Sequence, residues 1–270
     1  MWLDFAKMNG AGNDFILIDN RDLRVRLNAE QVARLCHRQR GIGADGLVLL
    51  IPSASGRADW AWDFYNSDGS VAEMCGNASR CFARFIQRLT GAQGRITFET
   101  GAGIITAVLS DGQVTVSLTS PRDLQLDQQI TVAGVPRTVH SLNTGVPHAV
   151  LFVEDADRAM IQTWGSEIRH HPHFSPKGTN ANFVEVLPGQ GIRVRTYERG
   201  VEGETLACGT GVTASALISA RVHRLKPPVR VRVQNGDWLQ VDFQEAQGGF
   251  SDVRLTGPAE FVFEGRIEVV

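Results

Sequence analysis

Two cysteines occupy matched settings in the two halves of the sequence: Cys75 is followed by Gly-Asn and Cys208 by Gly-Thr. A helix pattern begins directly after each one, so both thiols are predicted to lie at helix N-termini. At such a position the first backbone N–H groups have no acceptor within the helix, and the helix dipole is positive. It therefore binds anions and lowers the pKa of a thiol from about 8.5 towards neutrality.

A pair of thiols at two helix starts is suited to two kinds of chemistry. One is reversible disulfide formation, which would make the protein a non-catalytic thiol switch. The other is proton transfer on both faces of one carbon, in which a thiolate abstracts a proton and a thiol donates one. The helix N–H groups would then hold the adjacent carboxylate and stabilise the carbanion. This second chemistry is racemisation or epimerisation without a cofactor.

Several motifs that would indicate other chemistry are weak or absent. The chain has only three lysines (Lys7, Lys177 and Lys226) to form a Schiff base with pyridoxal phosphate. It has no C-x-x-C pair, and the histidines of the segment 170–173 lack H-E-x-x-H spacing, so no metal is expected. Cys36 and Cys81 lie inside apolar helix patterns and are predicted to be core residues.

The segment GIGADG at 41–46 has the spacing of a dinucleotide-binding fingerprint. A helix pattern precedes it and a strand pattern follows it, which is the reverse of the order that the fingerprint requires. We therefore interpret it as a helix-to-strand turn.

Charge and hydropathy limit the kinds of partner. The 27 basic residues are balanced by 29 acidic ones, so no basic surface is expected to bind nucleic acid. The longest aliphatic run, 47–51, is far shorter than the roughly 20 residues that span a membrane. No apolar leader pattern is present near residue 1, which favours a cytoplasmic location. The expected partner is a small molecule.

The elements that must position the thiols are mostly short strands separated by glycines. Helix patterns are fewer: they cover 29–38, begin near 75 and near 208, and include a short one at 165–169. Many strands with irregularly inserted helices favour an α+β fold over a doubly wound α/β fold. A boundary near Pro121 divides the chain into two halves of comparable length, with one of the two thiols in each.

Seven ordered regions of the chain resemble the diaminopimelate epimerase family. They are MNGAGNDF (8–15), GIGADG (41–46), FYNSDGS (64–70), MCGN (74–77), TGVPH (144–148), GTNANF (178–183), and YERG (197–200) leading to ACGTG (207–211). The resemblance implies two similar domains, each a β-barrel-like mixed sheet around a central helix. The implied domains are residues 1–119 with 261–270, and residues 120–260.

The resemblance also implies an activity: conversion of LL-2,6-diaminopimelate to the meso isomer by a homodimer, without a cofactor or metal. Cys75 and Cys208 would be the two acid/base groups, facing one stereocentre from opposite sides. The remaining implied site residues are, for the reacting carboxylate, Gly76, Asn77, Gly209 and Thr210; near the amino group and thiols, His148 and Glu198; and for the distal amino-acid end, Asn13, Asn66, Asn180 and Arg199.

Related activities remain as alternatives. A cofactor-independent racemase of proline, hydroxyproline or histidine has similar chemistry, but proline racemases usually carry His where Asn77 stands. Isomerases of the phenazine-biosynthesis type lack the thiol pair. The chain departs from the common family pattern at Val146, at Ala78 and in a loop, 198–204, that is one residue longer. These departures concern the distal end of the site and its loop geometry.

Overall fold

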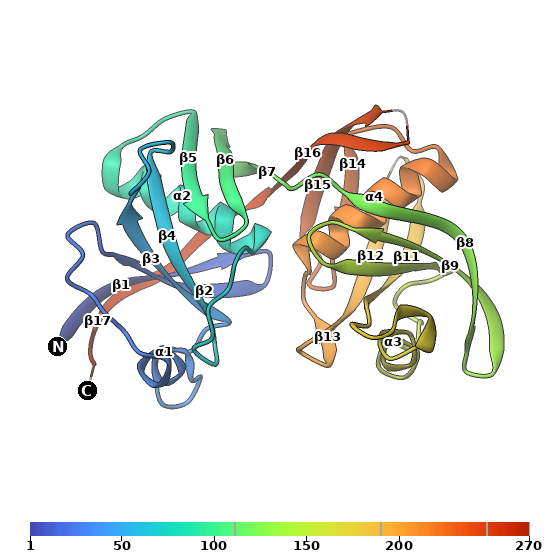
Figure 1. Cartoon of the computed structure of the whole chain (residues 1–270), viewed down its shortest axis with the longest axis horizontal. Helices are drawn as coiled ribbons and strands as arrows, with labels where there is room; N and C mark the ends of the chain where they lie inside the picture. Colours follow the sequence, from blue (N-terminus) through green and yellow to red (C-terminus); the bar gives the residue numbers. More distant parts are fainter. Residues whose placement is uncertain (111, 190, 247, 270) are drawn as a thin grey trace. The chain divides into compact units, whose positions relative to one another are not determined.

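The computed structural model describes residues 1–110, 112–189, 191–246 and 248–269. The chain forms two compact units, shown in Figure 1. Unit 1 consists of Met1–Ser117 and Gly257–Val270, and unit 2 consists of Leu118–Thr256. The last strand of the chain therefore belongs to the same unit as the first.

Unit 1 is built on one mixed sheet with two helices, α1 (Ala29–Cys36) and α2 (Gly76–Thr90). In hydrogen-bonded order the strands are β17 (Glu260–Glu268), β1 (Trp2–Gly10), β2 (Asn13–Asp19), β3 (Gly46–Pro52), β4 (Trp60–Asn66), β5 (Arg95–Thr100), β6 (Gly103–Ser110) and β7 (Gln113–Ser117).

Unit 2 contains the helices α3 (Ile161–Arg169) and α4 (Gly209–His223), with a 3₁₀ turn at Pro172–Phe174. Its strands, in hydrogen-bonded order, are β8 (Arg122–Val132), β9 (Val135–Asn143), β10 (Pro147–Phe152), β11 (Asn180–Leu187), β12 (Gly191–Glu198), β14 (Val229–Arg232), β15 (Trp238–Ala246) and β16 (Gly249–Pro258). The short β13 (Gly203–Thr205) pairs with β12.

The two units have the same topology. From β1 to β7 successive neighbours are antiparallel, parallel, antiparallel, parallel, antiparallel and antiparallel. The order from β9 to β16 is identical when β13 is set aside. Counted from β1 and from β9 in this matched series, one helix follows the second strand and another follows the fourth. The α+β class and the two similar domains are confirmed.

The second helix of each unit lies inside its sheet. Helix α2 contacts β1, β2 and β3 at one end of the strand order and β6 and β7 at the other, so the sheet curves around it. Helix α4 likewise contacts strands from β9 to β15. Helix α4 consists mainly of small and apolar residues, and 11 of its 15 residues are buried, as expected for a helix that its neighbours enclose.

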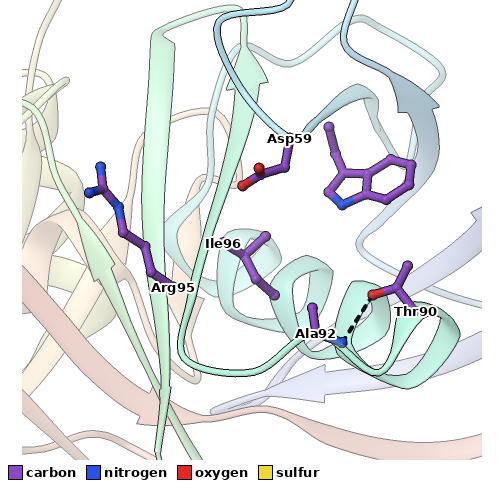
Figure 2. Close-up of a pocket in the computed structure, with 6 residues that line it drawn as sticks. Asp59, Thr90, Ala92, Arg95 and Ile96 are labelled. Carbon is purple, nitrogen blue, oxygen red and sulfur yellow. Dashed lines mark hydrogen bonds between the residues drawn. The ribbon is translucent and has the colours of Figure 1, made fainter.

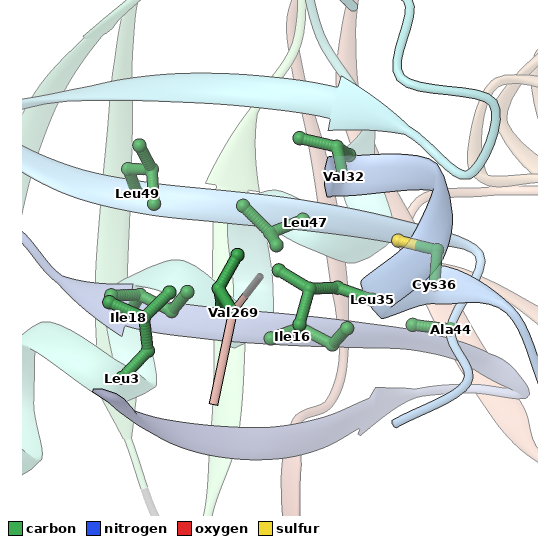
Figure 3. Packing of buried hydrophobic residues seen from close by; sticks show 10 residues of the cluster. All are labelled: Leu3, Ile16, Ile18, Val32, Leu35, Cys36, Ala44, Leu47, Leu49 and Val269. Atoms are coloured by element: carbon green, nitrogen blue, oxygen red, sulfur yellow. The ribbon is translucent and has the colours of Figure 1, made fainter. Parts of the chain in front are cut away.

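The first helix of each unit covers the outside of the sheet. Asn28 begins α1 with a capping box: its Oδ1 accepts from the backbone N–H of Gln31, and Gln31 Oε1 accepts from the N–H of Asn28. Figure 3 shows the apolar cluster that α1 closes, which consists of Leu3, Ile16, Ile18, Val32, Leu35, Cys36, Ala44, Leu47, Leu49 and Val269. Cys36 is thus a core residue, as predicted.

Two other predictions from the sequence can be compared with the structure. GIGADG lies between the end of α1 and the start of β3, which confirms a helix-to-strand turn. The short helix expected at 165–169 is longer, because α3 begins at Ile161. Met160 precedes it and offers no capping side chain, so the usual sequence signal for a helix start is missing. Among the described residues, no helix has the length and apolar character needed to cross a membrane.

Candidate active site

Cys75 stands at the N-terminus of α2, where the sequence predicted it. Its backbone is extended and its carbonyl accepts the first intrahelical bond, from Ser79 at 2.9 Å. The thiol does not cap the helix and is partly exposed. The first turn of α2 carries no acidic residue, so nothing in it repels an anion at the helix start.

A buried arginine ties this helix start to the first hairpin. The Arg80 guanidinium is fully buried and donates to the Asn77 side-chain carbonyl at 2.9 Å and to the backbone carbonyls of Gly10 and Gly76 at 3.3 Å. Gly10 permits this approach, because a Cβ there would lie 2.9 Å from the Asn77 carbonyl oxygen. No sequence pattern marks Arg80 as a site residue, because a single arginine on a helix usually indicates a solvated face.

Asn13 lies at the start of β2 with both ends of its amide engaged. Its Nδ2 donates to Asp45 at 2.9 Å, and its Oδ1 accepts from Asn77 Nδ2 at 2.5 Å. Asn66 ends β4 and pairs with Gly46, the residue after Asp45, so it lies at the same edge of the sheet. Asn66 is exposed and closes a turn by donating to Ser70 Oγ at 2.9 Å.

Below Asn13 the hairpin carries a partly buried ion-pair network. Asp14 accepts from Lys7 at 2.9 Å and from both terminal nitrogens of Arg38, at 2.9 and 3.0 Å. Arg38 also donates to Asp45 at 2.7 Å, and this bond positions the carboxylate that accepts the hydrogen bond from Asn13. Burial alone would raise the pKa of Asp14, but the hydrogen bonds from Arg38 and Lys7 lower it below its ordinary value.

Cys208 stands at the matched position in unit 2, directly before α4. Its carbonyl accepts from Val212 N–H at 2.8 Å, so α4 also begins where the sequence predicted. The residue is only 7% exposed, and its Sγ lies 3.5 Å from the Thr210 hydroxyl. The N–H groups of Gly209 and Thr210 belong to the first turn, which again carries no acidic residue.

His148 lies beside this helix start, on β10, and is completely buried. Its Nε2 is 2.9 Å from Thr210 Oγ1, and its Nδ1 is 3.2 Å from Asn182 Nδ2. Burial and the positive charge of Arg199 lower the pKa of His148 to about 3. The imidazole is therefore neutral at ordinary pH.

The remaining predicted residues of unit 2 lie around the end of β12. Asn180 donates to the Pro147 carbonyl at 3.0 Å and accepts from the backbone N–H of Arg199 at 2.8 Å. Arg199 Nη1 donates to the Lys177 carbonyl at 3.2 Å. Glu198 Oε2 accepts from Thr205 on β13 at 2.9 Å. Thus Asn180 holds the β12 end, and with it Arg199, against β10.

The other two cysteines behave as core residues. Cys36 and Cys81 are 3% and 0% exposed, and burial raises the pKa of each thiol to about 12. Both remain protonated thiols at neutral pH and are unsuited to proton abstraction. In the part of the chain that the structure describes, no cluster of three or more His, Cys, Asp or Glu side chains is arranged to hold a metal ion.

A surface pocket of unit 1 lies away from these residues. Figure 2 shows it at the C-terminal end of α2, beside Thr90, Ala92 and Asp59, with a volume of about 390 Å³. Helix α2 has 15 residues, so this pocket is about 22 Å along the helix from Cys75. In unit 2 a hollow of about 190 Å³ has His148 in its wall. The chemistry of the side chains, not pocket size, identifies the candidate site.

Two structural relatives support the fold. A protein of the phenazine biosynthesis PhzF family from Bacillus anthracis superposes with a TM-score of 0.75 and 13% identity, covering 100% of both chains. A hydroxyproline epimerase from Agrobacterium vitis superposes with a TM-score of 0.71 and 17% identity, covering 98% of this chain and 92% of that one. At these identities the likeness concerns the fold alone.

Sequence comparisons are more specific. Diaminopimelate epimerase from Aquifex aeolicus is 44% identical over 276 residues, covering 98% of both chains. The enzyme of that name from Chlorobaculum tepidum is 42% identical over 266 residues, covering 96% of this chain and 99% of its own. The family model described as diaminopimelate epimerase matches residues 5–123 and 140–262, and each stretch carries one of the two helix-start cysteines. The chain belongs to the diaminopimelate epimerase family.

Proposed function

We propose that this chain converts LL-2,6-diaminopimelate to the meso isomer by moving a proton at one α-carbon between Cys75 and Cys208. The observation that carries the proposal is the equivalence of the two thiols. Each is the N-cap residue of the helix that follows the fourth strand of the matched series, β4 in unit 1 and β12 in unit 2, when β13 is set aside. Relatives of 38–44% identity that bear the name diaminopimelate epimerase support the substrate.

In this mechanism the substrate α-carboxylate binds the N–H groups of Gly76, Asn77, Gly209 and Thr210. The two helix dipoles stabilise the negative charge that develops when the α-proton leaves. One cysteine acts as thiolate and abstracts the proton, and the other acts as thiol and delivers a proton to the opposite face. No pyridoxal phosphate or metal is required, because the helix N–H groups supply the stabilisation.

The distal amino-acid end of the substrate is assigned to Asn13, Asn66, Asn180 and Arg199. A guanidinium matches a carboxylate with two parallel hydrogen bonds, and side-chain amides both donate to carboxylates and accept from ammonium groups. Glu198 and His148 lie in the same unit as Arg199 and are assigned to the reacting amino group and the thiols. This polar set favours a substrate with a second charged end over proline.

Isotope exchange tests the proposal. The protein is incubated in deuterated water with LL-diaminopimelate, L-proline or L-histidine, without added cofactor, and deuterium at the α-carbon and the isomer ratio are followed. We expect exchange and meso product with diaminopimelate. Exchange with proline or histidine but not with diaminopimelate would show that the substrate is a different amino acid. Exchange with none of the three would contradict the proposed function.

Single substitutions test the two-thiol mechanism separately. Cys75→Ser and Cys208→Ser should each lose at least about 10²-fold in turnover, the usual contribution of one acid/base group. Cys36→Ser, at a buried thiol outside the site, is the matched control and should keep the turnover of any molecules that fold. Full activity in either site variant would contradict the mechanism.

The homodimer and the cytoplasmic location remain predictions. Light scattering on the purified protein measures the mass in solution, for which we expect twice 29.5 kDa. A mass of one chain at working concentration would contradict the dimer.

A further inference from the structure

Asn182, which the proposed function leaves without a role, has an orientation that its neighbours determine. It lies on β11 and is 1% exposed. Its Nδ2 is 2.9 Å from the backbone carbonyl of Ala149, which can only accept a hydrogen bond. Its Oδ1 accepts from the Thr196 hydroxyl at 3.0 Å. If the amide were flipped, Asn182 Oδ1 would face the Ala149 carbonyl oxygen, and neither of these two acceptors could donate a hydrogen bond.

This orientation determines the tautomer of His148. Asn182 Nδ2 uses one hydrogen for Ala149 and directs the other at His148 Nδ1, 3.2 Å away. A nitrogen that accepts a hydrogen bond must present a lone pair, so the single ring proton of neutral His148 is on Nε2. The pKa of His148, which burial and Arg199 lower to about 3, agrees with one uncharged ring nitrogen facing Asn182.

Two further contacts connect His148 to Cys208 through Thr210. Because Nε2 carries the proton, it donates to Thr210 Oγ1 at 2.9 Å. Within the described residues, the other polar neighbour of that hydroxyl is Cys208 Sγ at 3.5 Å. The Thr210 oxygen thus accepts from Nε2, and its own hydrogen is available to donate to the sulfur, which we assign as the acceptor. Hydrogen bonds to an anionic acceptor are stronger than those to a neutral one, so this bond favours the thiolate.

We propose that Asn182 is a positioning residue that acts through His148 and Thr210 to keep Cys208 as the thiolate before substrate binds. The inference rests on the proposed function for the meaning of that thiolate, which becomes the base of the resting enzyme. The directions of the bonds from Asn182 to His148 and from His148 to Thr210 come from the geometry alone, and the direction from Thr210 to the sulfur is part of the proposal.

The packing around Asn182 agrees with a position that must be held. A Cβ on Gly211 would lie 2.4 Å from Asn182 Oδ1 and 3.3 Å from His148 Cε1, so a side chain at 211 would displace both residues. The charged groups on the neighbouring elements include Glu198 and Arg199 at the end of β12, and Glu204 on β13, which pairs with Arg195 at 2.5 Å. The neighbouring elements also carry Glu185 on β11, Arg193 on β12, and Arg221 and His223 on α4. None of these is altered in the variants below, so their fields stay the same.

The test measures the pKa of Cys208 without substrate. In a Cys75→Ser background the ultraviolet absorbance of the thiolate reports Cys208, because burial raises the pKa of Cys36 and Cys81 to about 12. Asn182→Leu and Thr210→Val should each raise the pKa of Cys208 by roughly one pH unit, the size expected for one hydrogen bond to a charged sulfur.

Two further variants separate the relay from a general loss of structure. The double variant Asn182→Leu/Thr210→Val should show no larger shift than either single one, because both interrupt the same chain of bonds. Thr210→Ser keeps the hydroxyl and should restore the original value. Ser215→Ala removes a buried hydroxyl on α4 that makes no hydrogen bond within the described residues, and should change nothing.

Nitrogen NMR of the unsubstituted protein gives an independent readout, with the resonances of His148 assigned by their loss in His148→Gln. We expect the Nε2–H tautomer. The Nδ1–H tautomer, or an unchanged pKa of Cys208 in folded Asn182→Leu, would overturn the inference. If Asn182→Leu does not fold, Thr210→Val, Thr210→Ser and the NMR measurement decide it. Failure of the isotope exchange with success here would reject the proposed function and leave the hydrogen-bond relay standing.

Discussion

Asn77 Nδ2 donates to Asn13 Oδ1 across 2.5 Å, and this bond joins the first turn of α2 to the β1–β2 hairpin. Asn77 is assigned to the reacting carboxylate and Asn13 to the distal end of the substrate. The two ends of the proposed site within unit 1 are therefore coupled through one side-chain contact. Asp45 accepts from the other end of the Asn13 amide at 2.9 Å and so determines which way that amide faces.

Replacing Asn13 with alanine should weaken substrate binding and disturb Asn77. We expect KM for diaminopimelate to rise by about tenfold or more, the loss of one or two hydrogen bonds to a charged group. Steady-state kinetics measures it. Asn235→Ala, at an exposed turn in unit 2, is the control and should leave KM unchanged. An unaltered KM in Asn13→Ala would show that Asn13 serves only the hairpin.

Replacing Asp14 with asparagine should destabilise the fold. Lys7 is 6% exposed, so the substitution leaves its ammonium group buried beside Arg38 without the shared carboxylate. Removing one partner of a buried pair costs roughly 3 kcal/mol of the free energy of unfolding. Urea unfolding measures the loss. Asp19→Asn, which breaks a more exposed pair with Arg21, should cost less than about 1 kcal/mol.

His148 should make the stability of the fold depend on pH. Its pKa falls from 6.5 to about 3 on folding, so between these values the unfolded chain binds more protons than the folded one. Stability is therefore lost as the pH falls from about 6.5 towards 3, and this contribution is constant above that window. The share from His148 should be about 2 kcal/mol between pH 7 and pH 5.

Unfolding of the unsubstituted protein and of His148→Gln across that range measures this share as the difference between the two slopes. His170→Gln replaces an exposed histidine of the same unit and is the matched control variant. Equal slopes for His148→Gln and the unsubstituted protein would mean that His148 binds a proton as readily in the folded chain as in the unfolded chain.

Gly211→Ala should impair both stability and turnover. The new Cβ would lie 2.4 Å from Asn182 Oδ1 and 3.3 Å from His148 Cε1, and both of these side chains are buried. Overpacking of this kind costs about 1–3 kcal/mol. Thermal unfolding and turnover measure the two effects. Gly249→Ala, where a Cβ would meet nothing within 4 Å, is the matched control.

Much of the candidate chemistry was visible in the sequence because it depends on local features. A cysteine before a glycine at the start of a helix pattern predicts a thiol at a helix N-terminus, and both α2 and α4 begin there. The capping residue Asn28 marked the start of α1 in the same way. Where that local signal is missing, as at Met160, the sequence pattern places the start of the helix at 165 and not at Ile161.

The tertiary structure alone decided which polar groups meet. Arg80 donates to Gly10, 70 positions away, and Asn182 bonds His148, 34 positions away. No sequence pattern predicts either contact. The identical strand order of the two units is equally hidden, because the pairing of distant strands depends on how the whole sheet closes around its helix. Residue types and helix starts are properties of short segments, whereas hydrogen-bond direction and burial depend on neighbours that only folding brings together.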